Sequence, residues 1–396
     1  MKICHYASYD ANTGDNSTIY GIRKYFEKHS SIKEIKWIKK PNVEAQTLIT
    51  SSKSENKKIF ISQVVEYFRN MKKDEGCDLI VIGGGGQIED RKRWLTGMTL
   101  PFNKEILQEI DIPIACIGLG INYFREPVSF EPKQLSNNAF KNLELLIDKC
   151  IYFSIRNDGS YDILKKLFDR YKGSKEIFSK VKEMPDPGLF FEQELPRKTN
   201  KEIKNYIFQP AWNSSRRIAA GRGLLGGKGM TQIKELLTKN NNFHFMPHTL
   251  KDYTFFTKVD ESIPIAISKE DFKKYVLHKQ YASFIKDFYF KYDMSVAMRG
   301  HGQLNAIAIN MPSLYFSTQD KVRKFSLKNE FGDYNIDIQE EGCFEKLNHC
   351  TNRMLNDKNY LDEWYEIRDR KMLQFKKQFK DCVQEISQII DANNKK

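Results

Sequence analysis

Short apolar runs alternate with amphipathic stretches along most of this 396-residue chain, and this alternation restricts the fold more than any other feature. Apolar runs of strand length separated by helical periodicity are typical of parallel strands connected by helices. Strands are expected at 1–9, 79–82, 114–117, 150–155, 205–212, 243–246, 294–298 and 313–316. Helices are expected at 18–29, 59–71, 139–146, 231–239, 272–290, 302–309 and from Leu347 onward.

Proline, glycine and charged residues between 185 and 200 separate the two alternations. We therefore predict an α/β chain of two Rossmann-like domains that face a cleft. The N-terminal domain is expected over 1–195 and the C-terminal domain over 200–345, with helices over 346–396 packing back on both. Because parallel α/β sheets bind ligands at the carboxyl ends of their strands, the loops there should form the walls of the cleft.

The chain is basic, with a net charge of +13. Its basic runs at 33–40, 53–58 and 368–380 lack interleaved aromatic residues, so we interpret them as solvated surface and expect no nucleic-acid partner. Seven scattered cysteines without a CxxC pair indicate reduced, mostly buried thiols. The first residues lack the pattern of a signal peptide, and no apolar run reaches the roughly 18 residues that span a bilayer. The expected location is the cytoplasm, with an anionic membrane surface as a further partner at the inner face.

Glycine-rich loops follow two of the expected strands. Four consecutive glycines at 83–86 follow the run that begins at Asp78, and Gly118 and Gly120 follow the next strand. One glycine would suffice for a tight turn, so we interpret the four as backbone that approaches a ligand closely. The segment Asn12-x-Gly14-Asp15 lies between the first strand and the first helix, which either Asn16 or Ser17 could cap.

Two further patterns are discounted. Gly221, Gly223 and Gly226 match GxGxxG, but polar residues separate them from the preceding strand, so a dinucleotide fingerprint is not supported. Arg217, in the same loop, either binds an anion or is exposed to solvent. His244 and His248 are four residues apart with a proline between them, a spacing that does not bring them to one metal ion. No metal site is expected.

The most informative segment runs from 294 to 316. An apolar strand delivers Arg299 and His301 to its carboxyl end, and a helix of small residues begins near Gly302. The amino end of a helix offers backbone donors to an anion, so this segment predicts an anion-binding, chemically active site. The alternative is a helix-capping histidine beside a surface arginine.

Taken in order, these motifs resemble the polysaccharide pyruvyl transferase family over about residues 5–325. One departure concerns the family's Arg-Asp pair, because Arg156 is followed by Asn157 and the aspartate comes one place later. Residues 205–285 match only loosely. The motifs that carry the resemblance are Asn12-x-Gly14-Asp15, the glycine loop at 83–86, Gly118-x-Gly120, Ser154-Ile-Arg156, Asp186-Pro187, Arg299-x-His301 and Lys321.

The resemblance implies a GT-B-like fold and the transfer of a pyruvyl group from phosphoenolpyruvate to two hydroxyls of a sugar, which forms a cyclic ketal and releases phosphate. The acceptor would belong to a cell-surface glycan or its lipid-linked precursor, with no cofactor beyond phosphoenolpyruvate as co-substrate. The N-terminal domain would be the acceptor side and the C-terminal domain the donor side. A glycosyltransferase that uses a nucleotide sugar is the nearest alternative, and a non-enzymatic polyanion-binding protein is the second.

Three residues are predicted to be catalytic. His301 would act as general acid or stabilise the departing phosphate, since imidazole titrates near neutral pH. Arg299 would hold an anionic group of the donor. Asp15 would orient or deprotonate an acceptor hydroxyl, or would only cap the first helix. Substrate contacts are expected from Asn12, Gly14, Gly84, Gly85, Gly86, Gly118, Gly120, Arg156, Arg217, Gly302 and Lys321.

Overall fold

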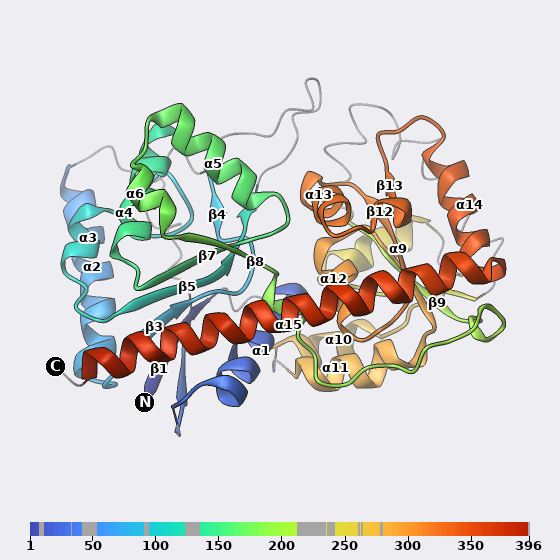
Figure 1. Ribbon diagram of the computed structural model, residues 1–396, viewed down its shortest axis with the longest axis horizontal. Coiled ribbons are helices and arrows are strands. Elements are labelled where there is room, and N and C mark those ends of the chain that lie inside the picture. Colours follow the sequence, from blue (N-terminus) through green and yellow to red (C-terminus); the bar gives the residue numbers. More distant parts are fainter. Residues whose placement is uncertain are drawn as a thin grey trace.

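The computed structural model describes residues 1–7, 12–32, 34–41, 54–90, 95–122, 135–211, 235, 242–259, 262, 264–277 and 280–394. Two parallel sheets lie side by side along its long axis, with helices around each of them (Figure 1). The predicted fold class, α/β with two Rossmann-like units and helices at the C-terminal end, is confirmed.

The first sheet has six parallel strands in the order β2-β1-β3-β5-β7-β8. Its strands are β1 (Lys2–Ala7), β2 (Lys36–Pro41), β3 (Leu79–Ile82), β5 (Ile114–Leu119), β7 (Tyr152–Arg156) and β8 (Val181–Met184). β4 (Ile88–Glu89) and β6 (Ile121–Asn122) form a separate pair. The helices of this unit are α1 (Thr13–His29), α2 (Ser54–Lys73), α3 (Lys104–Gln108), α4 (Asn137–Lys149), α5 (Ser160–Tyr171) and α6 (Lys175–Ser179).

The second sheet has five parallel strands in the order β10-β9-β11-β12-β13. Its strands are β9 (Tyr206–Gln209), β10 (Phe243–Phe245), β11 (Met294–Ala297), β12 (Ser313–Ser317) and β13 (Asn335–Asp337). Its helices are α9 (Asp252–Val259), α10 (Lys269–Leu277), α11 (Tyr281–Phe288), α12 (Gly300–Ala308) and α13 (Asp320–Lys328). The 3₁₀ turn η2 (Pro187–Leu189) follows β8, and α14 (Cys343–Asn356) and α15 (Lys358–Asn394) follow β13.

The strand orders place one crevice in each sheet. In the first sheet the chain runs from β1 outward to β2 and then returns to the other side of β1 with β3. In the second sheet it runs from β9 to β10 and returns with β11. Ligands of open α/β sheets bind where the order reverses, at the carboxyl ends of the strands. The turns after β1, β3, β9 and β11 are therefore the expected ligand-binding positions.

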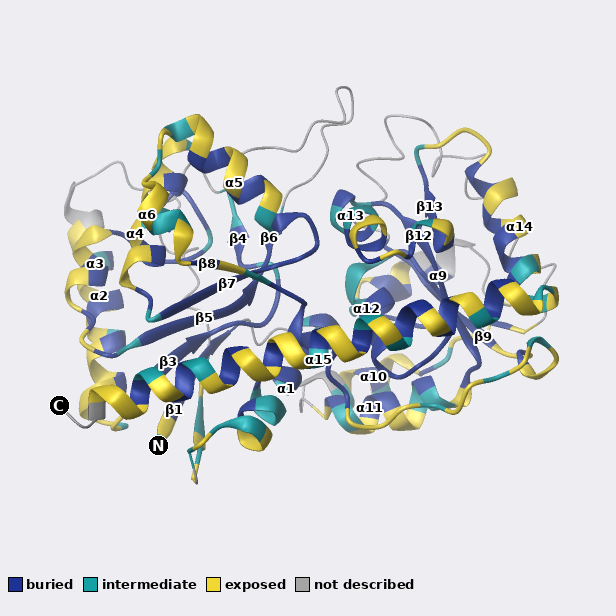
Figure 2. Ribbon diagram, viewed as in Figure 1, coloured by how far each residue is buried: buried dark blue, intermediate teal, exposed yellow. Residues whose placement is uncertain are grey.

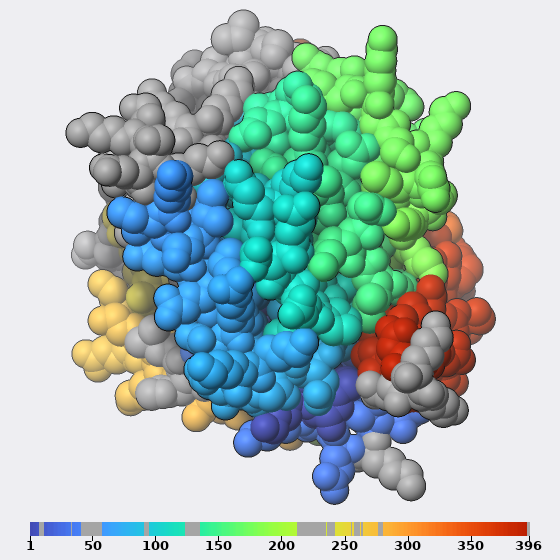
Figure 3. All heavy atoms as spheres, turned by 90° about the vertical axis from the view of Figure 1, so that its left-hand side faces the viewer, coloured from blue at the N-terminus to red at the C-terminus, as the bar shows by residue number. Residues whose placement is uncertain are grey.

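The last helix, α15, connects the two units. It has 37 residues, which corresponds to about 55 Å at 1.5 Å per residue. On the C-terminal unit, Arg368 donates to the backbone oxygens of Ile307 (2.9 Å) and Ala308 (3.1 Å), at the end of α12. On the N-terminal unit, Glu385 pairs with Lys182 at the edge of the first sheet. Figure 3 views this end of the molecule, where the last turns of α15 pack beside the first sheet.

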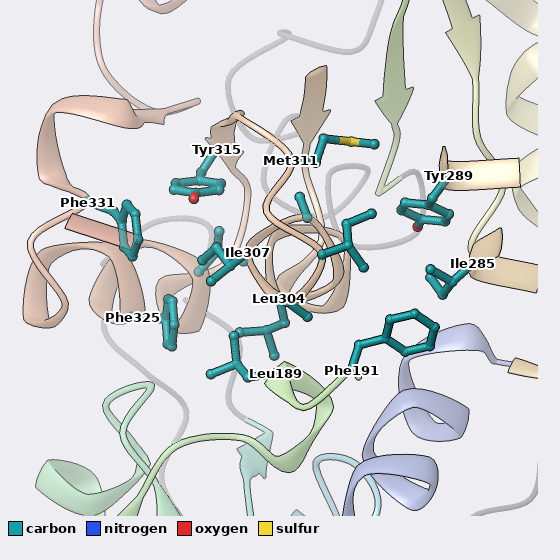
Figure 4. Close-up of a cluster of buried hydrophobic side chains, with 14 of the residues drawn as sticks. Leu189, Phe191, Ile285, Tyr289, Leu304, Ile307, Met311, Tyr315, Phe325 and Phe331 are labelled. Atoms are coloured by element: carbon teal, nitrogen blue, oxygen red, sulfur yellow. The ribbon is translucent and has the colours of Figure 1, made fainter. Parts of the chain in front are cut away.

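A continuous apolar core joins the two units. Buried residues run through both sheets and most of the helices, as the dark blue segments of Figure 2 show. Around α12, Leu189 at the end of η2 and Phe191 just after it pack toward Leu304, Ile307 and their neighbours (Figure 4). The face of the first sheet away from α12 packs in a second cluster against α2, α3 and α4. All seven cysteines are buried, and none of them forms a disulfide bond.

Several local predictions were wrong. The first helix begins at Thr13 rather than near Thr18, because Asn12 accepts a hydrogen bond from the Gly14 N–H and caps it in place of Asn16 or Ser17. The edge strand β2 was not predicted, although the basic run 33–40 that contains it is exposed or half-buried in its described residues, as the interpretation as surface requires. Arg368 in the run 368–380 is buried, since its guanidinium bonds α12 and Glu194. The helix expected at 231–239 lies outside the described residues apart from residue 235.

Among the described helices, none combines the length and apolar character needed to span a bilayer.

Candidate active site

The amino end of α1 forms one side of the site. Asn12 caps this helix, and Asp15 lies in its first turn beside the glycine loop that follows β3. A Cβ atom placed on Gly85 would lie 2.2 Å from Asp15 Oδ1, so only glycine leaves room for this carboxylate. Gly85 also has φ +111°, a backbone conformation that L side chains rarely adopt. The first crevice therefore holds the Asp15 carboxylate packed against the backbone of the glycine loop.

His301 approaches the same helix from the C-terminal unit. It lies in the first turn of α12, directly after β11, as the strand-to-helix pattern predicted. Its Nε2 is 3.3 Å from Thr18 Oγ1 and 3.4 Å from Asp186 Oδ2. A Cβ on Gly14 would lie 2.3 Å from His301 Nδ1, so the imidazole packs directly on the backbone of α1. The two crevices thus meet at this ring.

Asp186 is the buried centre of the contact between the units. Its carboxylate pairs with Arg156 and accepts hydrogen bonds from Thr18 Oγ1 (3.1 Å) and the Gly188 N–H (2.8 Å). Burial alone would raise the pKa of Asp186, but Arg156 and His301 hold it well below its ordinary value. The carboxylate is therefore ionised at neutral pH and anchors both the Arg156 guanidinium and the His301 ring.

The predicted glycines mostly make room for side chains. A Cβ on Gly120 would lie 2.5 Å from an Nη atom of Arg156, and one on Gly86 would lie 2.2 Å from Asn122 Oδ1. A Cβ on Gly302 would lie 2.2 Å from Gln209 Oε1, and one on Gly118 would lie 2.6 Å from Pro187 Cδ. Close approach thus explains these glycines, although the neighbours are side chains of the chain itself.

Two pockets meet at His301 and Lys321. The smaller lies mainly against the C-terminal unit. The larger lies on the N-terminal unit. The smaller pocket is lined by Arg156, Asp158, Asp186, Gly300, His301, Gln303, Leu304, Lys321 and Phe325. The larger is lined by Asn12, Asp15, Gly84, Gly86, Gln87, Glu89, Thr99, Leu100, Asn122, His301 and Lys321.

The smaller pocket has features suited to an anion. Arg156 Nε is buried and finds no hydrogen-bond partner within the described part of the chain. Lys321 donates to Asn122 Oδ1 at 3.2 Å, and burial together with Arg156 lowers its pKa, against the opposing effect of nearby carboxylates. The amino ends of α12 and α13 open on this pocket, and neither has a side-chain hydrogen bond from its cap residue.

Arg299 lies apart from both pockets. Its Nη2 donates to Asp252 Oδ1 at 2.6 Å and its Nε to the backbone oxygen of Pro210 at 2.8 Å. The guanidinium predicted to hold the donor is thus engaged by a carboxylate of the same unit. Arg217, like Gly221, Gly223 and Gly226, lies outside the described residues. The remaining predicted residues meet at the two crevices.

Sequence reasoning missed several polar residues of the site. Asp186 was interpreted only as the end of a domain and as part of a family motif, although its position after a strand was an available signal. His248 was considered only as a metal ligand, yet its ring stacks on that of His301 at a centroid distance of 6.1 Å. Thr18 and Asp252 carried no signal that separates them from ordinary helix residues.

The fold and the site define a two-unit α/β protein with two pockets between the units. Residues 12–320 match the family model described as polysaccharide pyruvyl transferase, and the chain belongs to this family. It is accordingly a transferase of polysaccharide biosynthesis. No curated protein sequence matches the chain.

Solved structures similar to the chain extend over nearly its whole length. A putative UDP-N-acetylglucosamine 2-epimerase from Listeria monocytogenes is 11% identical, with 96% of this chain and 97% of that chain covered and a TM-score of 0.49. MnaA of S. aureus with UDP is 11% identical, with 92% and 91% covered and a TM-score of 0.47. The spinosyn rhamnosyltransferase SpnG is 7% identical, with 100% of both chains covered and a TM-score of 0.45.

Proposed function

We propose that the protein transfers the pyruvyl group of phosphoenolpyruvate to two hydroxyls of one sugar, forming a cyclic ketal and releasing phosphate. The observation that carries this proposal is the pair of pockets that share His301 and Lys321. A group transfer between a small anion and a sugar needs two adjoining sites with acid–base groups at their junction. His301 and Lys321, the two shared residues, both have side chains that can donate or accept a proton.

The smaller pocket is the proposed donor site. Phosphoenolpyruvate carries a phosphate and a carboxylate, which guanidinium groups, ammonium groups and helix amino ends bind. Arg156 supplies an unpartnered buried donor, Lys321 a cation, and α12 and α13 their amino ends. Most of these groups come from the C-terminal unit, in agreement with the donor side implied by the family.

The larger pocket is the proposed acceptor site. Its lining comes mainly from the N-terminal unit and is rich in carboxylate and amide groups, which accept hydrogen bonds from sugar hydroxyls. Asp15 lies there, next to the shared His301, and is the proposed group that orients or deprotonates an acceptor hydroxyl. The glycine loop brings backbone groups to the same wall through Gly84 and Gly86.

The proton balance of the reaction defines the tasks of these groups. Two sugar hydroxyls lose a proton each; one proton ends on the methyl carbon of the ketal and the other on the released phosphate. In the proposed sequence His301 protonates the methylene carbon, the first hydroxyl attacks C2, the bond between C2 and the phosphate oxygen breaks so that phosphate leaves, and the second hydroxyl attacks C2 and closes the ring. Ionised Asp186 keeps the imidazole beside the junction.

The acceptor is proposed to belong to a cell-surface glycan or to its lipid-linked precursor. A positively charged chain is attracted to the anionic inner face of a membrane, where such a precursor would lie. Flotation with vesicles of phosphatidylglycerol and phosphatidylcholine tests this part. Binding that disappears at high salt supports it, and no binding at low salt contradicts it.

The donor proposal is tested first by thermal unfolding with millimolar phosphoenolpyruvate, phosphate, UDP or GDP. A ligand at a hundredfold of its dissociation constant stabilises the fold by about 2.7 kcal/mol. We expect phosphoenolpyruvate to raise the melting temperature of the wild type but not of Lys321→Ala. Lys324→Ala is the matched control, because Lys324 lies one turn further along α13 and pairs with Asp320.

Turnover is then measured as phosphate release with a panel of glycans, and the ketal methyl group is identified by NMR. His301→Ala should bind phosphoenolpyruvate but release no phosphate. Stabilisation by UDP or GDP alone would instead identify a glycosyltransferase. No stabilisation by millimolar phosphoenolpyruvate would contradict the donor assignment.

A further inference from the structure

His248 and Asp252 connect the two units next to His301, and neither has a role in the reaction proposed above. His248 follows β10 in the C-terminal unit and is buried, as is Asp252 at the start of α9. Burial lowers the pKa of His248 well below its ordinary value, and the nearby cations add to this, so its ring is neutral. This ring stacks on that of His301.

Asp252 holds the loop that carries His248. Its Oδ2 accepts the backbone N–H groups of His248 and Thr249, both at 2.8 Å. Its Oδ1 accepts from Arg299 Nη2 at 2.6 Å. This one carboxylate therefore fixes the 248–249 loop relative to the residue that precedes α12, the helix on which His301 lies.

The same loop contacts the amino end of α1. Thr13 Oγ1 lies 2.9 Å from His248 Nδ1, and the Thr13 N–H donates to the backbone oxygen of His248 at 3.3 Å. Asn12, the cap of α1, forms an isolated antiparallel bridge with Thr249. The connection thus runs from Arg299 through Asp252 and the 248–249 loop to the helix turn that carries Asp15.

We propose that His248 and Asp252 are positioning residues, which set the distance between His301 of the C-terminal unit and the amino end of α1. The inference rests on the proposed function, because His301 and Asp15 are its acid–base groups. We name the connection the Asp252 link. It consists of Arg299, Asp252, His248 and Thr249 with their partners Asn12 and Thr13.

Asp293 provides a matched control for Asp252. It is also buried, its Oδ1 pairs with Lys198, and its Oδ2 accepts two consecutive backbone N–H groups, of Lys204 and Asn205, both at 2.9 Å. The two aspartates therefore have the same kinds of partner, one basic side chain and two consecutive backbone N–H groups. Asp293 precedes β11, however, at the end of the sheet opposite to the site.

The experiment compares Asp252→Asn with Asp293→Asn. Both changes should lower the melting temperature by similar amounts, since each weakens the same pattern of hydrogen bonds. Only Asp252→Asn should lower kcat, by about tenfold or more, with a smaller change in the KM for phosphoenolpyruvate, because a displacement of about 1 Å at reacting groups costs roughly 10²-fold. Equal kcat values for the two folded variants would overturn the proposal.

A second pair of variants covers the case in which Asp252→Asn does not fold. His248→Phe keeps an aromatic ring against His301 but loses the bond to Thr13, and Thr13→Val removes the same bond from the other side. Each should lower kcat, and the double variant should be no worse than the poorer single one. His244→Phe, within β10 and half-buried, is the control that should retain full kcat. Full activity in both single variants would contradict the proposed role.

A spectroscopic measurement separates the failure of this proposal from the failure of the proposed function. The chain has seven histidines, so ¹⁵N-histidine labelling gives few ring signals, and that of His301 is identified by its loss in His301→Ala. Asp252→Asn should shift the His301 signal and Asp293→Asn should not. This readout needs no turnover. A protein inactive with phosphoenolpyruvate but with this shift would contradict the function and support the link, and an unshifted signal would contradict the link.

Discussion

Gly14→Ala tests the contact between α1 and His301 most directly. The added Cβ would lie 2.3 Å from His301 Nδ1 and 2.4 Å from its Cγ. Non-bonded atoms of this kind are comfortable only at roughly 3.5 Å, so the ring must withdraw from α1 by about 1.2 Å. The Nε2 atom of His301 is now 3.3 Å from Thr18 Oγ1 on the same helix and would then lie beyond hydrogen-bond distance of it.

The expected result is a folded protein with little activity. A displacement of about 1 Å at a reacting group lowers kcat roughly 10²-fold, which corresponds to about 2.7 kcal/mol in the barrier. The free energy of unfolding should change less, because alanine in a helix is favoured over glycine by roughly 0.5–1 kcal/mol while overpacking costs about 1–3 kcal/mol. Phosphate release and thermal unfolding measure the two effects separately.

Gly332→Ala is the control for the same substitution away from the site. The nearest atom to its new Cβ would be Leu327 Cδ2 at 3.4 Å, an ordinary contact, so kcat and melting temperature should both remain close to those of the wild type. If Gly14→Ala is folded and keeps kcat within about threefold of the wild type, His301 does not act from the position beside α1, and the reasoning is refuted.

Two further predictions concern charged groups of the site. Asp186→Asn should destabilise the fold at neutral pH by roughly 3–5 kcal/mol, since it leaves Arg156 buried without its carboxylate. The pKa of Asp186 is depressed in the folded state, so the unfolded chain takes up a proton at this residue first as the pH falls. The difference in free energy of unfolding between the wild type and Asp186→Asn should therefore shrink below about pH 4. Urea titrations that show the same difference at every pH would contradict this prediction. Burial lowers the pKa of Lys321, so affinity for phosphoenolpyruvate should fall with rising pH before an exposed lysine would lose its proton. In Lys321→Arg the guanidinium stays protonated, so calorimetric titrations should show no loss of phosphoenolpyruvate affinity at alkaline pH. The same loss of affinity in the wild type and in Lys321→Arg would assign the titration to another group.

Much of the fold follows from patterns that lie within single elements. β3, with the sequence Leu-Ile-Val-Ile, is buried at every position, and such a run is recognisable without its neighbours. β2 escaped prediction because it is an edge strand with three lysines, and β13 because it is three residues long and polar. These two strands are specified by the strands beside them, since their own residues have no apolar pattern.

The residues of the site likewise include some that a local sequence pattern predicts and others that only the tertiary structure shows. His301 could be predicted because the strand, the Arg-x-His motif and the helix are contiguous in the sequence. Asp252 bonds Arg299 from 47 positions away, and Thr13 contacts His248 from 235 positions away. A buried carboxylate or imidazole of this kind is defined by partners that only the tertiary structure brings near, so one sequence contains no local signal for it.

The long last helix has a consequence for synthesis. Each sheet can form as soon as its own strands have left the ribosome, but α15 packs on both units, through Arg368 on α12 and through Glu385 on β8. Translation must therefore reach the end of α15 before the contacts that hold the units together are complete. The contacts of α12 with α1 and η2 do not involve α15, so the last helix adds a second, later set of contacts between the units.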